Sequence, residues 1–191
     1  MRYALIAAAV ILASCSKPGA EADGSSPAST PPSSVSSGAY APMAAFAPFS
    51  GKTFRGEWTD DEGSRLVDIA KWELILNGRA LQSTHRLEGG DYGGRTIFFY
   101  DEAAKKYVFH YFTTAGFHTS GVAEFVDGAL VTNEKVEGHD TIASVRSVVA
   151  FKADVLELDV IYVGKDGSEM PGGHRIYKEI AGSGRLFADT L

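Results

Sequence analysis

From about residue 49 to residue 180 the chain alternates short runs rich in Val, Ile, Phe, Tyr and Thr with turns that contain Gly or Asp. Aromatic and β-branched residues favour strands, and Gly, Asn and Asp favour the turns between them. No stretch of this region keeps a helical period for three turns. The sequence therefore predicts an all-β domain with strands at 53–59, 66–76, 79–88, 94–100, 106–113, 117–126, 129–136, 143–151, 155–163 and 172–180.

Short turns between consecutive strands favour one architecture over the others. Asn77-Gly78 and Asp127-Gly128 each supply the positive φ angles of a two-residue hairpin. About ten antiparallel strands joined in this way most simply close as a single up-and-down β-barrel, because closure removes the exposed edges of an open sheet. A two-sheet sandwich is the alternative fold.

Alternation along the strands predicts which side chains face the barrel interior. In the second strand the apolar residues alternate with Lys71 and Glu73, and the ninth strand repeats this pattern. The third strand places a serine and a histidine on its apolar face. We therefore expect five inward residues to line a ligand site: Trp72, Ser83, His85, Leu158 and Tyr162. The strands at 94–100 and 106–113 are aromatic on both faces, so the pattern leaves their orientation open, and an apolar outer face there would suit a protein contact.

The amino terminus predicts a membrane anchor. A short apolar run follows Arg2 and ends in Leu-Ala-Ser-Cys at 12–15, which resembles the lipobox of bacterial lipoproteins. The resemblance implies a signal peptide at 1–14 and acylation of Cys15, the single cysteine of the chain. Several acyl chains hold a protein on a membrane far more firmly than one. Ser16 after the cysteine resembles the outer-membrane sorting pattern, which implies a protein of the bacterial cell envelope that faces the periplasm.

Composition divides the rest of the chain into three parts. Residues 15–45 are rich in Ser, Pro, Ala and Gly, as expected of a disordered tether that buries too little apolar surface to fold. The barrel follows at 46–180, and 181–191 is expected to be a loose carboxyl-terminal tail. Loss of the signal removes one of 18 basic residues, which leaves 17 against 24 acidic residues and a formal charge of −7. Such a charge argues against nucleic acid and anionic headgroups as partners.

No motif of catalysis or metal binding stands out. The five histidines lack the spacing of a zinc site, and no serine lies in a nucleophile elbow. We therefore predict neither an enzyme nor a cofactor. His174 is the one candidate haem ligand, because it begins the last strand, although its more ordinary role is that of a solvated histidine at a strand end.

Several landmarks resemble known barrels. Gly56-Glu57-Trp58 opens the first strand like the Gly-x-Trp signature of the lipocalin and calycin barrels. Together with 71–81 (KWELILNGRAL), 99–101 (FYD) and 106–108 (KYV), it resembles a bacterial lipocalin-like family that has no established reaction. The resemblance covers residues 49–180 and implies a small closed barrel. We expect Trp58 to plug the base, and Arg79 to cap that end, to lie over an indole ring or to remain in solvent.

These observations leave three functions open. The first is a lipid-anchored barrel that binds a small, largely apolar molecule, oriented by inward polar groups such as Ser83 and His85. The second is a module of the cell envelope that docks another protein. The third is an enzyme of unknown type.

Overall fold

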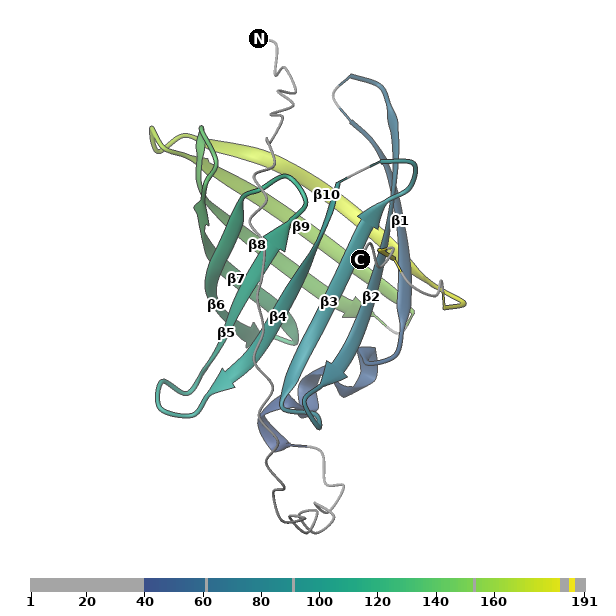
Figure 1. Ribbon diagram of the computed structural model, residues 1–191, viewed down its shortest axis with the longest axis vertical. Helices are drawn as coiled ribbons and strands as arrows, with labels where there is room; N and C mark the ends of the chain where they lie inside the picture. Colours follow the sequence, from purple (N-terminus) through teal and green to yellow (C-terminus); the bar gives the residue numbers. More distant parts are fainter. Residues whose placement is uncertain (1–39, 61, 91, 153, 183–185, 188–191) are drawn as a thin grey trace, which may run out of the picture. The chain divides into compact units, whose positions relative to one another are not determined.

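The computed structural model describes residues 40–60, 62–90, 92–152, 154–182 and 186–187 (Figure 1). Cys15 and nearly all of the predicted tether lie outside these residues. A 3-10 helix, η1 (Ala41–Phe49), precedes ten strands: β1 (Thr53–Thr59), β2 (Arg65–Ile75), β3 (Ala80–Leu87), β4 (Gly93–Asp101), β5 (Lys106–Thr113), β6 (His118–Val126), β7 (Ala129–Glu137), β8 (Ile142–Lys152), β9 (Val155–Gly164) and β10 (Glu169–Ile180).

The ten strands close into one barrel. Each strand pairs antiparallel with the strands before and after it in the chain, and β1 pairs with β10 to complete the ring. The prediction of a single up-and-down barrel is therefore confirmed, and the sandwich is excluded. Closure satisfies the backbone groups that the edges of an open sheet would leave unpaired.

One of the two expected hairpins has the predicted form. Val126 pairs with Ala129, and the residues between them, Asp127 and Gly128, have φ angles of 49° and 82°. The other prediction was wrong in detail, because β2 ends at Ile75 and β3 begins only at Ala80. Residues 76–78 all have positive φ there, which gives a four-residue turn in place of a two-residue one.

The helix η1 closes one end of the barrel (Figure 1). Its Met43 and Phe46 are 1% and 0% exposed and belong to the central apolar cluster. Phe46 lies 5.2 Å from the rings of Tyr107 and Phe125 and 6.0 Å from that of Phe98, measured between centroids. The Tyr107 hydroxyl donates to the carbonyl of Pro42 at 2.5 Å. The side chains of η1 therefore fill this end of the barrel.

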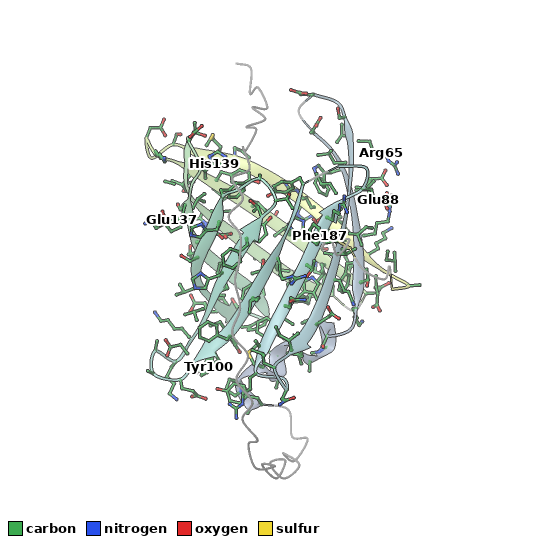
Figure 2. All side chains as sticks on the ribbon, viewed as in Figure 1. Arg65, Glu88, Tyr100, Glu137, His139 and Phe187 are labelled. Atoms are coloured by element: carbon green, nitrogen blue, oxygen red, sulfur yellow. The ribbon has the colours of Figure 1, made fainter. Side chains whose placement is uncertain are left out.

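The two ends of the barrel differ in their connections. The end near η1, which we call the η1 end, carries the turns after β2, β4, β6 and β8, and the opposite end, the distal end, carries the turns after β1, β3, β5, β7 and β9. Figure 2 shows Tyr100 near the η1 end, whereas Arg65, Glu88 and His139 lie at the distal end. Among the described residues η1 is the only helix, and it is too short to cross a membrane.

Two segments outside the strands pack onto the barrel. Tyr40 lies beneath the guanidinium of Arg79, 4.6 Å from its ring centroid, and donates a hydrogen bond to Glu102. Arg79 was expected to cap its end of the barrel, to lie over an indole or to remain in solvent, and the ring that it contacts is a phenol in place of the expected indole. Near the carboxyl terminus, Phe187 contacts the outer face of β3 under the guanidinium of Arg86 (Figure 2).

Candidate functional site

A group of polar side chains lines the inner wall of the barrel in its distal half. Asp68 on β2 shares the inner face with Ala70, whose cross-strand partner is His85 on β3. The same face of the following strands carries a tyrosine on β5, and β10 and the β3–β4 turn contribute two more. We call these five residues the polar cluster: Asp68, His85, Tyr92, Tyr111 and Tyr177.

Hydrogen bonds join the polar cluster into one chain. The Tyr177 hydroxyl donates to Asp68 Oδ2 at 3.0 Å, and His85 Nδ1 lies 3.1 Å from Asp68 Oδ1. On the other side of the imidazole, His85 Nε2 lies 2.7 Å from the Tyr111 hydroxyl, which lies 3.1 Å from that of Tyr92. The histidine is therefore held at both nitrogens, between a carboxylate and a phenol.

Burial varies along this chain of hydrogen bonds. The side chain of Asp68 is only 5% exposed, whereas that of His85 is 22% exposed although both ring nitrogens are bonded. Because His85 faces the interior, its remaining exposure indicates that solvent reaches the inner wall at this level. Its hydrogen bonds to Asp68 and Tyr111 on the inner wall confirm the prediction that His85 points inward.

Two glycines make room for the tyrosine rings. A Cβ at Gly94 would lie 2.3 Å from Cε2 of Tyr111, and a Cβ at Gly56 would lie 2.7 Å from Cε1 of Tyr177. Both distances are shorter than any side chain tolerates, so the rings lie directly on the backbone of β4 and β1. The positions of these phenols therefore depend on the absence of a side chain at each glycine.

Burial also determines the protonation of the phenols. Desolvation raises the pKa of Tyr111 far above its ordinary value, and the charges on Asp68 and Glu134 act in the same direction. Burial likewise raises the pKa of Tyr177 and of Tyr92. All three remain neutral phenols with a proton to donate, since a buried phenolate would lose its hydration.

Next to the polar cluster lies a second acid, which is half-buried. Glu134 on β7 bonds the hydroxyl of Thr119, a 2% exposed residue that is the cross-strand partner of Tyr111. Burial raises the pKa of the Glu134 carboxyl, and the hydrogen bond from Thr119 opposes this shift only in part. The inner wall therefore holds a carboxyl group that forms no ion pair with the described residues.

The sequence led us to expect that Trp58 plugs the base of the barrel, and the structure shows that it does not. It is half-buried near the distal end of β1, and η1 closes the opposite end. The guanidinium of Arg175 stacks on its indole at 4.5 Å from the ring centroid and donates to the carbonyl of Gly172. Trp58 lies in the strand half that points away from η1, so it cannot reach the end that η1 fills.

The predicted ligand-binding residues lie on two sides of the barrel. Trp72 and Ser83 are cross-strand partners on β2 and β3, close to His85. Leu158 and Tyr162 both lie on β9, where they pair with Val149 and Val145 of β8. Trp72 is 7% exposed, and its indole N–H has no hydrogen-bond partner among the described residues. The structure thus gathers Trp72, Ser83 and His85, and places Leu158 and Tyr162 on a separate strand.

Sequence reasoning missed four members of the polar cluster. Asp68 carried a usable signal, because it has the same parity along β2 as Trp72 and so shares its inward face. Tyr111 carried none, since its strand is aromatic on both faces. Tyr92 and Tyr177 face the cluster from a turn and from the last strand, where local alternation was not decisive.

Outside the barrel, large apolar side chains are exposed on neighbouring strands. Phe99, Val108 and Val122 are consecutive cross-strand partners on β4, β5 and β6, and Phe99 and Val122 are 43% and 41% exposed. Phe112 is 53% exposed and stacks against His118, with 6.0 Å between the ring centroids. This set, which we call the outer aromatic face, resolves the orientation of the strands that the pattern had left open.

Comparison with protein-family models finds no match to the chain, and comparison with curated proteins finds none either. Within the described residues, no three side chains among His, Cys, Asp and Glu lie close enough together to hold a metal ion. His174, the candidate haem ligand, lies on the outer side of β10, where its Nδ1 is 2.8 Å from Asp159 Oδ1 and its side chain is 51% exposed.

Proposed function

We propose that this chain is a binding protein whose barrel holds one small, largely apolar molecule in its distal half. The observation that carries the proposal is the inward position of the polar cluster. Burial of polar groups costs free energy, and the barrel does not need them to close, because the matching wall of the η1 end is apolar. A hydrogen-bonded histidine that solvent still reaches is suited to orient the polar end of a ligand.

The filled η1 end restricts where such a molecule would lie. Met43 and Phe46 fill the interior at the η1 end, where Phe46 contacts β4, β5 and β6, so the ligand would lie between the polar cluster and β9. Leu158 and Tyr162 would contact its apolar body there, while Tyr92, which is joined to His85 through Tyr111, would bond its polar end. A donor without a partner, the indole N–H of Trp72, adjoins the same wall.

The location of the protein is a separate part of the proposal. The sequence at 12–15 supports a lipid anchor on Cys15 and a place in the bacterial cell envelope, at the outer membrane and facing the periplasm. The described chain begins with Tyr40, which packs at the η1 end. A ligand would thus exchange at the end of the barrel opposite the attachment of the tether. Incorporation of a palmitate analogue into the wild-type chain, and its loss in Cys15→Ala, tests the anchor.

One observation favours a second function, that of a protein-docking module. The outer aromatic face presents Phe99, Phe112 and Val122 to solvent on adjacent strands, and contiguous apolar surface of this kind is typical of contact sites. In this case the interior would serve stability alone. The polar cluster argues against that role, because a purely structural interior gains nothing from a buried carboxylate.

Thermal melting of the full chain with a panel of fatty acids, quinones and isoprenoid alcohols tests the binding function. A ligand at 100 times its Kd adds about 2.7 kcal/mol to the free energy of unfolding. We expect one class to raise the melting temperature of the wild type and to lose that effect in His85→Ala. His110→Ala is the matched control, because His110 is exposed on the outer side of β5.

Two results would count against binding. Flat melts with every class, together with no co-purifying molecule in native mass spectrometry, would leave the docking module as the better explanation. Equal loss of ligand response in His85→Ala and His110→Ala would remove the interior site even if a ligand binds elsewhere.

A further inference from the structure

The hydrogen bonds of the polar cluster have a fixed direction, and Asp68 determines it. A carboxylate only accepts hydrogen bonds, so His85 Nδ1 must carry the proton that faces Asp68 Oδ1. When the ring carries one proton, His85 Nε2 is an acceptor and receives a hydrogen bond from the Tyr111 hydroxyl. Tyr111 then has only lone pairs left, so the Tyr92 hydroxyl must donate to it. With His85 in this singly protonated form, every proton of the hydrogen-bonded chain points toward Asp68.

The outer end of this chain of hydrogen bonds, at Tyr92, therefore offers a ligand a lone pair and no proton. The single O–H of Tyr92 donates to Tyr111, so the free side of the Tyr92 oxygen can only accept a hydrogen bond. Tyr177, on the other side of Asp68, also has no proton left for a ligand, because its hydroxyl donates to Asp68 Oδ2. A ligand group that only accepts would meet Tyr92 as an unpaired acceptor, which costs free energy in a desolvated site.

From this polarity we propose that the barrel selects a neutral molecule that carries a hydroxyl or another hydrogen-bond donor, in preference to a carbonyl compound of the same shape. The inference rests on the proposed binding function and names the class of its ligand. The charge of Arg175, which acts on Tyr92 and Tyr177, is offset by that of Asp68 in the same space, so the interior offers no net positive charge to an anionic ligand. The donor of the ligand would bond the oxygen of Tyr92.

The substitution Asp68→Asn should reverse the direction of the chain. The amide must keep its oxygen toward Tyr177, because Asp68 is the one acceptor that this buried hydroxyl has among the described residues. Its NH₂ group then donates to His85 Nδ1, which moves the ring proton to Nε2. His85 would donate to Tyr111, Tyr111 to Tyr92, and Tyr92 would present its proton to the ligand.

Three probes of nearly the same shape measure this preference: tetralin, 2-tetralone and 2-tetralol, which offer no polar group, an acceptor, and a donor with an acceptor. Titration of the full chain should show 2-tetralol binding about tenfold more tightly than 2-tetralone. In Asp68→Asn the two should bind alike, and both more tightly than tetralin. In Tyr92→Phe all three should bind alike. Tyr100→Phe, an inward phenol at the η1 end, should leave the tenfold ratio unchanged.

Nitrogen-15 spectra of the imidazoles test the direction without any ligand. At a pH where His85 carries one proton, we expect the Nδ1–H tautomer in the wild type and the Nε2–H tautomer in Asp68→Asn. An Nε2–H tautomer in the wild type, or a tetralol preference that Asp68→Asn leaves intact, would overturn the inference. Equal binding of the three probes would overturn it and leave the binding function standing, whereas binding of none, together with flat melts, would refute both.

Discussion

Replacement of Phe46 by Ala should cost much of the stability of the barrel, because η1 contributes core residues and is more than a surface turn. Full burial of a Phe side chain stabilises by about 1.5–3 kcal/mol, and each aromatic pair adds about 0.5–1.5 kcal/mol. Phe46 is 0% exposed and has two ring partners at 5.2 Å, Tyr107 and Phe125. The sum agrees with the roughly 3–5 kcal/mol measured for buried Phe→Ala substitutions.

Urea unfolding followed by circular dichroism measures this loss, and Phe112→Ala is the matched control. Phe112 is 53% exposed on the outer side of β5, so its truncation should change the free energy of unfolding by less than about 0.5 kcal/mol. For a chain of this size the loss in Phe46→Ala corresponds to a drop in melting temperature of roughly 6–20 °C. A loss below about 1 kcal/mol, with an unchanged transition, would show that η1 detaches independently and would refute its role as a plug.

Two further predictions concern the inner wall. Gly94→Ala should destabilise the barrel by about 1–3 kcal/mol, because the new Cβ would meet the ring of Tyr111, whereas Gly90→Ala, whose Cβ has an ordinary contact at 3.6 Å, should be nearly neutral in urea unfolding. The raised pKa of Glu134 means that the folded state keeps its proton to a higher pH than the unfolded state does. The contribution of Glu134 to stability should therefore fall as the pH rises past about 4.3, and Glu134→Gln should gain stability relative to the wild type between pH 4 and pH 7. Equal pH profiles for Glu134→Gln and for the exposed control Glu124→Gln would contradict the assignment.

The sequence allowed the barrel to be predicted because its strands carry strong local signals. The alternation around Trp72 determined the inward face of β2, and Asp127-Gly128 determined the turn between β6 and β7. The plug could not be found in this way. With two prolines and four alanines among its nine residues, η1 resembles the Pro-rich segment before it. Only burial of Phe46 against distant strands makes it part of the core.

Prediction of the candidate site succeeded where one strand sufficed and failed where several must meet. His85 was assigned to the interior from the parity of β3 alone, and its partner Asp68 could have been assigned from β2. Tyr111 on β5 bonds His85 across β4, and Tyr177 lies 109 residues from Asp68 and reaches it only because the ring of strands closes. Local periodicity contains no information about such contacts.

The contact that closes the barrel also fixes the polar cluster. Tyr177 on β10 pairs with Gly56 on β1, and its hydroxyl reaches past that strand to Asp68 on β2. The reach is possible because no side chain at Gly56 stands between the ring and the β1 backbone. Asp68 in turn orients His85, so the direction of every proton in the cluster depends on the seam between the first and last strands. A change that loosens this seam would therefore alter what the interior can bind before it unfolds the barrel.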